Sequence, residues 1–270
     1  MGASRSPISP CLPMPDAQCP MPNAQFPNYM NESERYLFDL QGFLVVENVL
    51  TDDEILALRK LVDKQVAIKN QPEASKLRFD GLLSWGKPFL NLIDNPRITP
   101  YLSELLGKFR LDHDYLHIIR EGLGPIGCYL HGGGTPYDPT QYYSFRNGRI
   151  YNGLLAVAYE LNDVHPGDGG FACIPGSHKS NLACPQEWIN LEFPRDIVKS
   201  VAVKAGSAII FTEALSHGTL PWQGKNERRT LFYKYSPGSY AWLRNYYNPE
   251  EFEDLTASQR EMLKTPGVYP

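Results

Sequence analysis

The chain has 270 residues, of which 42% are hydrophobic and 21% are charged, and its formal net charge is -4. No apolar run approaches the roughly 20 residues that a membrane-spanning helix needs. The scattered basic residues argue against nucleic-acid binding, so a small molecule is the expected partner. Five cysteines without C-x-x-C spacing argue against a disulfide framework and a structural zinc site, and predict a reducing, cytoplasmic setting.

The first part of the chain differs in composition from the rest. Residues 1–30 are rich in proline and have almost no apolar periodicity, which predicts a disordered tail. We expect a single domain over residues 31–270, a length that one all-β sandwich or barrel can reach. The sequence does not predict the oligomeric state.

The domain begins with a predicted strand and two predicted helices. Residues 42–50 are rich in β-branched side chains after a glycine and predict a strand. Thr51 and Glu54 have the spacing of a capping box, and apolar residues then recur at helical spacing, which predicts a helix. A second helix is predicted over residues 98–106.

Short β-prone runs, separated by glycine and proline, follow these helices. They cover residues 126–130, 151–161, 170–174, 200–203, 208–212 and 230–235. A last helix is predicted over 249–263, with acidic residues early and basic residues late. The predicted fold class is mainly β with flanking helices, a cupin-like jelly roll or double-stranded β-helix.

Three residues at strand ends indicate chemistry. His131 ends a β-prone run and enters three glycines, His217 follows another such run, and Arg228 lies eleven residues further. Any one of the histidines, taken alone, is better explained as a structural imidazole. Together the three residues suit an iron(II) oxygenase, in which imidazoles bind iron and a guanidinium grips a carboxylate of the co-substrate.

Four segments resemble, as a set, the phytanoyl-CoA dioxygenase family: DLQGFLVVENVLTDDEI, GDGGFACIPGSHKSN, SHGTLPW and ERRTLFYKY. The resemblance implies a double-stranded β-helix with iron(II) bound by His131 and His217. It also implies that Arg228 and Thr219 hold 2-oxoglutarate. In the family an aspartate usually follows the first histidine by two residues, whereas this chain has Gly133.

Gly133 cannot supply a carboxylate, so chloride is an expected ligand of the iron at the open position. The His-x-Gly pattern resembles the iron- and 2-oxoglutarate-dependent halogenases. This resemblance implies chlorination of an unactivated C–H bond in a free small molecule, with a deoxynucleotide of antibiotic biosynthesis among the expected substrates. In the alternative, a carboxylate arrives from Asp138, or less readily from Glu213, and the enzyme is a hydroxylase. The third possibility is a non-catalytic binding module.

The loop after His131 offers substrate-side candidates. Tyr137, Tyr142 and Arg146 provide aromatic faces for a ring and a cation for a phosphate, and we add Asn152 to this set. The plain alternative is a tyrosine-rich surface loop with a solvated arginine.

Two further histidine-containing patterns have simpler explanations. His-Gly-Gly-Gly also occurs at the oxyanion hole of lipases, but the sequence has no G-x-S-x-G nucleophile motif. Asp112 and Asp114 flank His113, and strand alternation places the aspartates on one face and the histidine on the other. His178, in a PGSH turn, is expected to be structural or to line the pocket.

Overall fold

The computed structural model describes residues 30–121, 128–244 and 246–268. Apart from Met30, the predicted tail therefore lies outside the described residues. The α-helices are α1 Glu32–Gln41, α2 Asp52–Lys69, α3 Lys87–Leu90, α4 Thr99–Leu106 and α5 Ala257–Met262. Short 3-10 helices lie at Leu82–Trp85, Ser177–Lys179, Gln186–Trp188 and Pro249–Glu251.

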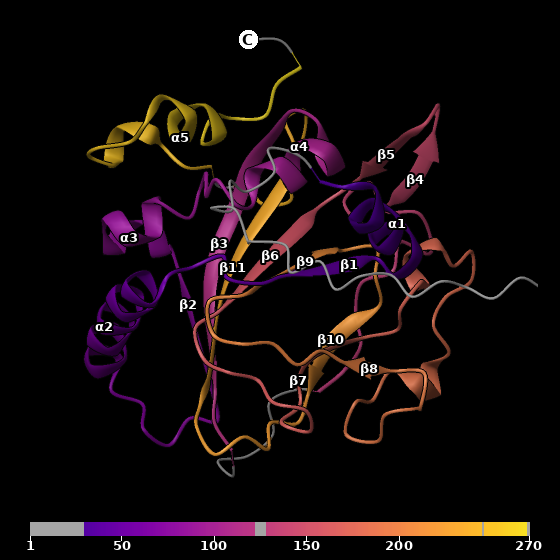
Figure 1. Ribbon diagram of the computed structural model, residues 1–270, viewed down its shortest axis with the longest axis horizontal. Coiled ribbons are helices and arrows are strands. Elements are labelled where there is room, and N and C mark those ends of the chain that lie inside the picture. Colours follow the sequence, from indigo (N-terminus) through magenta and orange to yellow (C-terminus); the bar gives the residue numbers. More distant parts are fainter. Residues whose placement is uncertain (1–29, 122–127, 245, 269–270) are drawn as a thin grey trace, which may run out of the picture.

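The strands form antiparallel sheets. They are β1 Phe43–Val46, β2 Lys76–Asp80, β3 Phe109–Ile119, β4 Tyr143–Arg146, β5 Arg149–Asn152, β6 Leu155–Glu160, β7 Gly170–Cys173, β8 Lys199–Ser200, β9 Ala208–Thr212, β10 His217–Leu220 and β11 Arg228–Pro237. The large sheet has the order β1-β9-β6-β11-β3-β2, the small sheet has the order β10-β7-β8, and β4 pairs with β5 (Figure 1). The described chain is therefore mainly β with flanking helices, as the sequence predicts.

The two faces of the large sheet have different partners. Its outer face packs on the helices through a core that includes Leu58, Leu102 and Tyr233. Its inner face packs toward the small sheet through a second core, in which Phe211 of β9 meets Phe171 of β7. Polar side chains that point to this inner face are enclosed between the two sheets, and this enclosure positions the site.

Local sequence signals account for the predicted helices, with one correction. The Thr51 capping box forms, with Glu54 bonding back to the cap, and α2 and α4 match their predictions. The single helix predicted over 249–263 is wrong, because the segment contains one 3-10 turn and then the short α5. Thr256 caps α5 in an extended conformation and so separates the two helical pieces.

The predicted strands form to different extents. The structure confirms β7, β9 and β11, while the run over 151–161 is divided between β5 and β6 at Gly153, whose missing side chain admits the Thr140 carbonyl. The run over 200–203 contributes only the end of β8 and an isolated bridge at Val203. Residues 126–127 lie outside the described residues, and the remainder of that run forms one bridge, at Tyr129.

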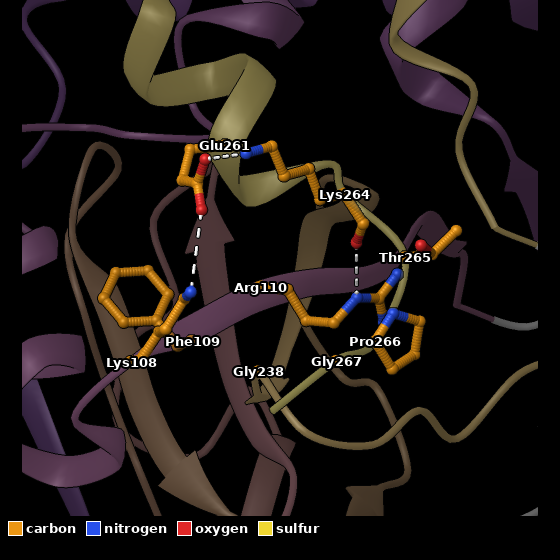
Figure 2. Close-up of a pocket in the computed structure, with 9 residues that line it drawn as sticks. All are labelled: Lys108, Phe109, Arg110, Gly238, Glu261, Lys264, Thr265, Pro266 and Gly267. Atoms are coloured by element: carbon orange, nitrogen blue, oxygen red, sulfur yellow. Dashed lines mark hydrogen bonds and ion pairs between the residues drawn. The ribbon is translucent and has the colours of Figure 1, made fainter. Parts of the chain in front are cut away.

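The C-terminal helix is attached to the start of β3 (Figure 2). The Arg110 Nε donates to the carbonyl of Lys264 over 3.0 Å, and the Lys108 ammonium lies 3.8 Å from the Glu261 carboxylate. A cavity of about 270 Å³ lies between these residues. Among the residues that the structure describes, none of the helices is long and apolar enough to cross a membrane.

Candidate active site

His131 and His217 lie side by side where the small sheet begins. Their backbones form an isolated antiparallel bridge, with N–O distances of 2.8 and 2.9 Å. The centroids of the two imidazole rings are 4.3 Å apart. Residues 86 positions apart in the sequence are thus held together by backbone hydrogen bonds, as a shared metal site requires.

Both imidazoles are held in the form that binds a metal. The Nδ1 of His217 lies 2.7 Å from the Leu215 carbonyl, and the Nδ1 of His131 lies 3.4 Å from the Tyr129 carbonyl. A carbonyl only accepts, so these contacts assign the proton to Nδ1 and leave Nε2 unprotonated. Burial lowers the pKa of His217 to about 3 and also lowers the pKa of His131, so both rings are neutral at pH 7.

A buried carboxylate, Glu213, accompanies the histidine pair. It follows β9, and its Oε2 lies 3.8 Å from the Nε2 of His217. Its Oε1 forms a buried ion pair with the ammonium of Lys234 on β11. Burial alone would raise the pKa of Glu213, but Lys234 and the two histidines hold it at about 2, so the carboxylate is ionised.

The three glycines after His131 are required by the backbone. Gly133 has φ +83°, its N–H donates to the Glu213 carbonyl over 3.1 Å, and a Cβ there would lie 3.0 Å from the Ser216 hydroxyl. A Cβ on Gly132 would lie 2.5 Å from the Leu215 carbonyl, and one on Gly134 would overlap the backbone of the same loop. Left-handed φ and close approach both favour glycine, so Gly133 has a conformational explanation that does not involve a halide.

Asp138, the first alternative source of a carboxylate, is engaged within its own loop. Its Oδ1 accepts from the backbone N–H of Thr140 over 2.7 Å and from the hydroxyl of the same residue. Glu213, which the sequence ranked lower, is the carboxylate that the fold brings to the histidines.

These residues fit an iron(II) ion through two neutral imidazoles with free Nε2 atoms, which are suitable ligands for iron. Within the described part of the chain, no three His, Cys, Asp or Glu side chains are already grouped closely enough to hold a metal. Glu213 could complete such a group through Oε2, the oxygen near His217, while its Oε1 keeps the ion pair with Lys234. How closely Lys234 holds the Glu213 carboxylate is therefore the variable feature of the site.

Arg228 is placed to hold a second carboxylate. It begins β11, is 2% exposed, and forms an ion pair through Nη2 with Glu160, which also accepts from the Thr230 hydroxyl over 2.7 Å. The Nε of Arg228 is buried and has no partner among the described residues. A Cβ on Gly170 would lie 3.2 Å from this Nε, so the glycine leaves space beside the free donor.

Thr219 belongs to the same region. It lies on β10 opposite Phe171, next to the pairing of Leu220 with Gly170, and strand alternation gives it the same face as His217. The unpaired Nε and the space at Gly170 fit a carboxylate such as that of 2-oxoglutarate, although Glu160 already neutralises part of the guanidinium charge.

The four substrate-side candidates do not come together. Tyr137 and Tyr142 are neighbours, with ring centroids 6.1 Å apart, but Arg146 is exposed at the end of β4, where it pairs with Arg149. Asn152 is buried and donates to the carbonyl of Leu105 in α4 over 3.1 Å.

The remaining histidine-containing patterns have structural roles. His178 is buried, and its Nε2 lies 3.0 Å from the Asp39 carbonyl. Asp112 accepts from Arg110 over 3.1 Å, and Asp114 accepts from the backbone of Leu82. His113 stacks on Tyr115 on the other face, although its Nδ1 is 2.7 Å from its neighbour Asp112.

The sequence-based reasoning missed Glu160 and Lys234. Arg228, Thr230 and Lys234 lie two or four positions apart on β11 and so share its inner face with Phe232. Polar residues that recur on one face of a buried β-prone run are the signal that could have identified them.

Comparisons with known proteins agree with this geometry. The family model "Phytanoyl-CoA dioxygenase (PhyH)" matches residues 130–230, which include both histidines, Glu213 and Arg228. An ectoine dioxygenase of Bordetella parapertussis is 21% identical over 267 residues, covering 84% of this chain and 80% of that protein. An ectoine dioxygenase of Streptomyces anulatus is 20% identical, covering 72% of this chain and 67% of that protein.

Solved structures share the fold. HygX from Streptomyces hygroscopicus with nickel and 2-oxoglutarate bound has a TM-score of 0.72 at 22% identity, covering 86% of this chain and 94% of that one. The non-haem α-ketoglutarate-dependent carbocyclase SnoK of nogalamycin biosynthesis has a TM-score of 0.58 at 17% identity, covering 78% and 85%. With the paired histidines and the free arginine donor, these matches identify the chain as a non-haem iron(II)- and 2-oxoglutarate-dependent oxidoreductase.

Proposed function

We propose that this enzyme hydroxylates an unactivated C–H bond of a small molecule, with His131, His217 and Glu213 as the iron ligands. The observation that carries the proposal is the position of Glu213, whose carboxylate lies 3.8 Å from the Nε2 of His217. The backbone carbonyl of Glu213 also accepts a hydrogen bond from the N–H of Gly133. The similarity to ectoine dioxygenases supports oxygenation. We further propose that the two sheets form a double-stranded β-helix, as the fold of HygX and SnoK suggests.

Glu213 would replace the carboxylate that Gly133 lacks. Two histidines and one carboxylate on one face of iron(II) leave positions open for co-substrate and oxygen. In this chain the carboxylate would come from the turn before the second histidine instead of the loop after the first. Lys234 then balances the carboxylate charge while the site is empty.

The reaction consumes one oxygen molecule, one 2-oxoglutarate and one substrate R–H, and yields R–OH, succinate and carbon dioxide. Bound iron and 2-oxoglutarate supply the oxidising chemistry, and the protein supplies position and exclusion. Arg228 and Thr219 would hold the distal carboxylate of 2-oxoglutarate. Phe211, whose ring centroid is 4.6 Å from that of His217, covers one side of the imidazole and keeps water away.

Halogenation is the second candidate, and the ion pair between Glu213 and Lys234 is the observation that favours it. If the ion pair with Lys234 keeps the Oε2 of Glu213 from reaching the iron, the metal has no protein carboxylate, and a position beside Gly133 stays open for chloride. The two candidates therefore differ in whether this one oxygen binds the metal.

Anaerobic titration of the metal-free protein with iron(II) and 2-oxoglutarate, with and without chloride, distinguishes them. We expect a visible charge-transfer band that is indifferent to chloride in the wild-type protein and becomes sensitive to chloride in Glu213→Gln. A wild-type band that tightens or shifts with chloride would show that the position beside Gly133 is open to halide and would favour the halogenase candidate. A protein that gives no band under any condition would contradict both.

A further inference from the structure

A cavity of about 620 Å³ opens beside the histidine pair, and His131, Gly133 and Ser216 form part of its wall. Small-molecule sites have volumes of about 300–1,000 Å³, so this cavity is large enough for a substrate. Its other walls come from the segment after β7, including Ile174, and from the short helix that carries Trp188.

Among the residues that the structure describes, those that line this cavity include no Arg, Lys, Asp or Glu. The carbon-rich part of the wall comes from Leu130, Ile174, Pro185, Trp188 and Ile189. Burying a charged group against such a wall would leave it without a counter-ion, at a large cost in free energy. The wall therefore discriminates against charged ligands.

Three of the four hydroxyl groups in the wall take part in hydrogen bonds within the protein. Thr135 donates to the Ser180 carbonyl over 3.1 Å, and Ser180 donates to the Leu182 carbonyl over 2.8 Å. The hydroxyl oxygen of Ser177 accepts from the backbone N–H of Ser216 over 2.8 Å. Apart from the Ser216 hydroxyl and the Gln186 amide, a ligand therefore meets mainly apolar surface, with few groups to recognise its polar atoms.

We propose that this cavity binds the substrate and that the substrate is an uncharged, largely apolar small molecule, held against Trp188 with its reacting carbon toward His131. This inference rests on the proposed function, because it is the metal site at His131 that makes the cavity a substrate pocket. It disfavours the nucleotide expected from the sequence, since a phosphate requires cations that the wall lacks.

The candidate Arg146 and the two cations of the smaller cavity do not supply positive charge to this wall. Arg146 is exposed and does not line the cavity. Lys108 and Arg110 line the smaller cavity at the C-terminal helix, where Glu261 and the Lys264 carbonyl already engage them (Figure 2). The two cavities have no lining residue in common.

A matched pair of fluorescent probes tests the chemical class. N-phenyl-1-naphthylamine is neutral, and 1-anilinonaphthalene-8-sulfonate carries the same ring system with one negative charge. Both are titrated into the metal-free protein and into the anaerobic complex with iron(II) and 2-oxoglutarate. Deoxyadenosine monophosphate is added as a competitor. The variants are Trp188→Ala and, as the matched control, Trp242→Ala, which removes a partly exposed indole outside the cavity.

We expect the neutral probe to bind at least tenfold more tightly than the anionic one and to resist competition by the nucleotide. Trp188→Ala should weaken the neutral probe about tenfold or more, as loss of a large buried aromatic contact predicts, and Trp242→Ala should leave it unchanged. Equal loss of binding in both variants, or anionic binding that depends on Trp188, would overturn the inference.

The charge-transfer band keeps this test separate from the proposed function. If the band forms but Trp188→Ala binds the neutral probe as tightly as the wild-type protein does, the cavity is not the substrate site, while the oxygenase assignment stands. If the probe binds through Trp188 but no band forms with iron(II) and 2-oxoglutarate, the cavity takes neutral ligands and the proposed function fails. When the band does form, the neutral probe should also shift it, because the probe lies beside a metal ligand.

Discussion

Replacing Glu213 by Gln removes the proposed carboxylate ligand and nearly preserves the side-chain volume. Loss of a partner that only orients a ligating histidine weakens metal binding about 10- to 100-fold. A directly bound carboxylate should contribute at least as much, so we expect the affinity for nickel(II) or cobalt(II) to fall by about 100-fold or more, roughly 2.7 kcal/mol.

The ion pair with Lys234 adds a stability effect that must be separated from metal binding. The side chains of Glu213 and Lys234 are 10% and 6% exposed, so removing either partner leaves a buried charge alone. Breaking such a pair costs about 3–5 kcal/mol. Both Glu213→Gln and Lys234→Met should therefore lower the melting temperature of the metal-free protein.

Metal then distinguishes the two variants. In Lys234→Met the unpaired carboxylate gains a new partner when metal binds, so nickel(II) should raise the melting temperature more than it does in the wild-type protein. In Glu213→Gln, nickel(II) should raise the melting temperature less than it does in the wild-type protein, because a ligand is missing. The double variant removes both charges and should recover stability without recovering affinity.

Isothermal titration calorimetry and thermal unfolding, each with and without nickel(II), measure these quantities. Asp138→Asn is the matched control, because it removes a carboxylate from the same region and should leave the affinity unchanged. If folded Glu213→Gln binds nickel(II) as tightly as the wild-type protein, Glu213 is not a ligand and the reasoning is refuted.

Three other results are expected. Gly133→Asp should lower the free energy of unfolding by about 1–2 kcal/mol, because the φ of residue 133 is +83° and the Ser216 hydroxyl is close. The same substitution should not tighten metal binding, and tighter binding in calorimetry would contradict this expectation. Arg228→Lys should weaken 2-oxoglutarate binding, measured by the charge-transfer band, by roughly tenfold to a hundredfold, whereas Arg229→Lys should not, because Arg229 is paired with other carboxylates. Burial lowers the pKa of His178 to about 4, so the unfolded chain binds its proton first as the pH falls below about 6.5. Through this group, the free energy of unfolding of the wild-type protein should therefore fall by up to about 1.4 kcal/mol per pH unit as the pH decreases from about 6.5 to about 4. Denaturant unfolding at several pH values should show a smaller slope of this free energy against pH in His178→Gln. Equal slopes in the two proteins would exclude the effect.

Much of the fold could be predicted from local signals. The capping box at Thr51 fixes the start of α2, and the β-branched run over 208–212 coincides with β9. For β3, an eleven-residue strand inside the large sheet, only residues 112–114 are predicted as strand, because charged residues interrupt the apolar pattern. Asp112 and Asp114 are buried there through hydrogen bonds to distant backbone groups, which local patterns do not reveal.

The site shows the same division between local and tertiary information. His131, His217 and Arg228 could be named because each stands at an end of a β-prone run that the sequence shows. The closeness of Glu213 to both histidines could not be predicted, because it depends on the antiparallel bridge that brings His131 beside His217. Asp138 is close to His131 in sequence, yet its loop turns its carboxylate back to Thr140.

Gly133 shows why a missing ligand in a motif is a weak guide to chemistry. A glycine at this position can leave room for a halide, and it can equally satisfy a left-handed turn that passes under Ser216. The second explanation needs no ligand and follows from the backbone alone. What decides the reaction is whether another carboxylate can reach the metal, and the fold places Glu213 within 3.8 Å of the Nε2 of His217. The loop can then keep its glycine for conformational reasons while the turn before His217 supplies the charge, so that oxygenation and the His-x-Gly pattern are compatible in one site.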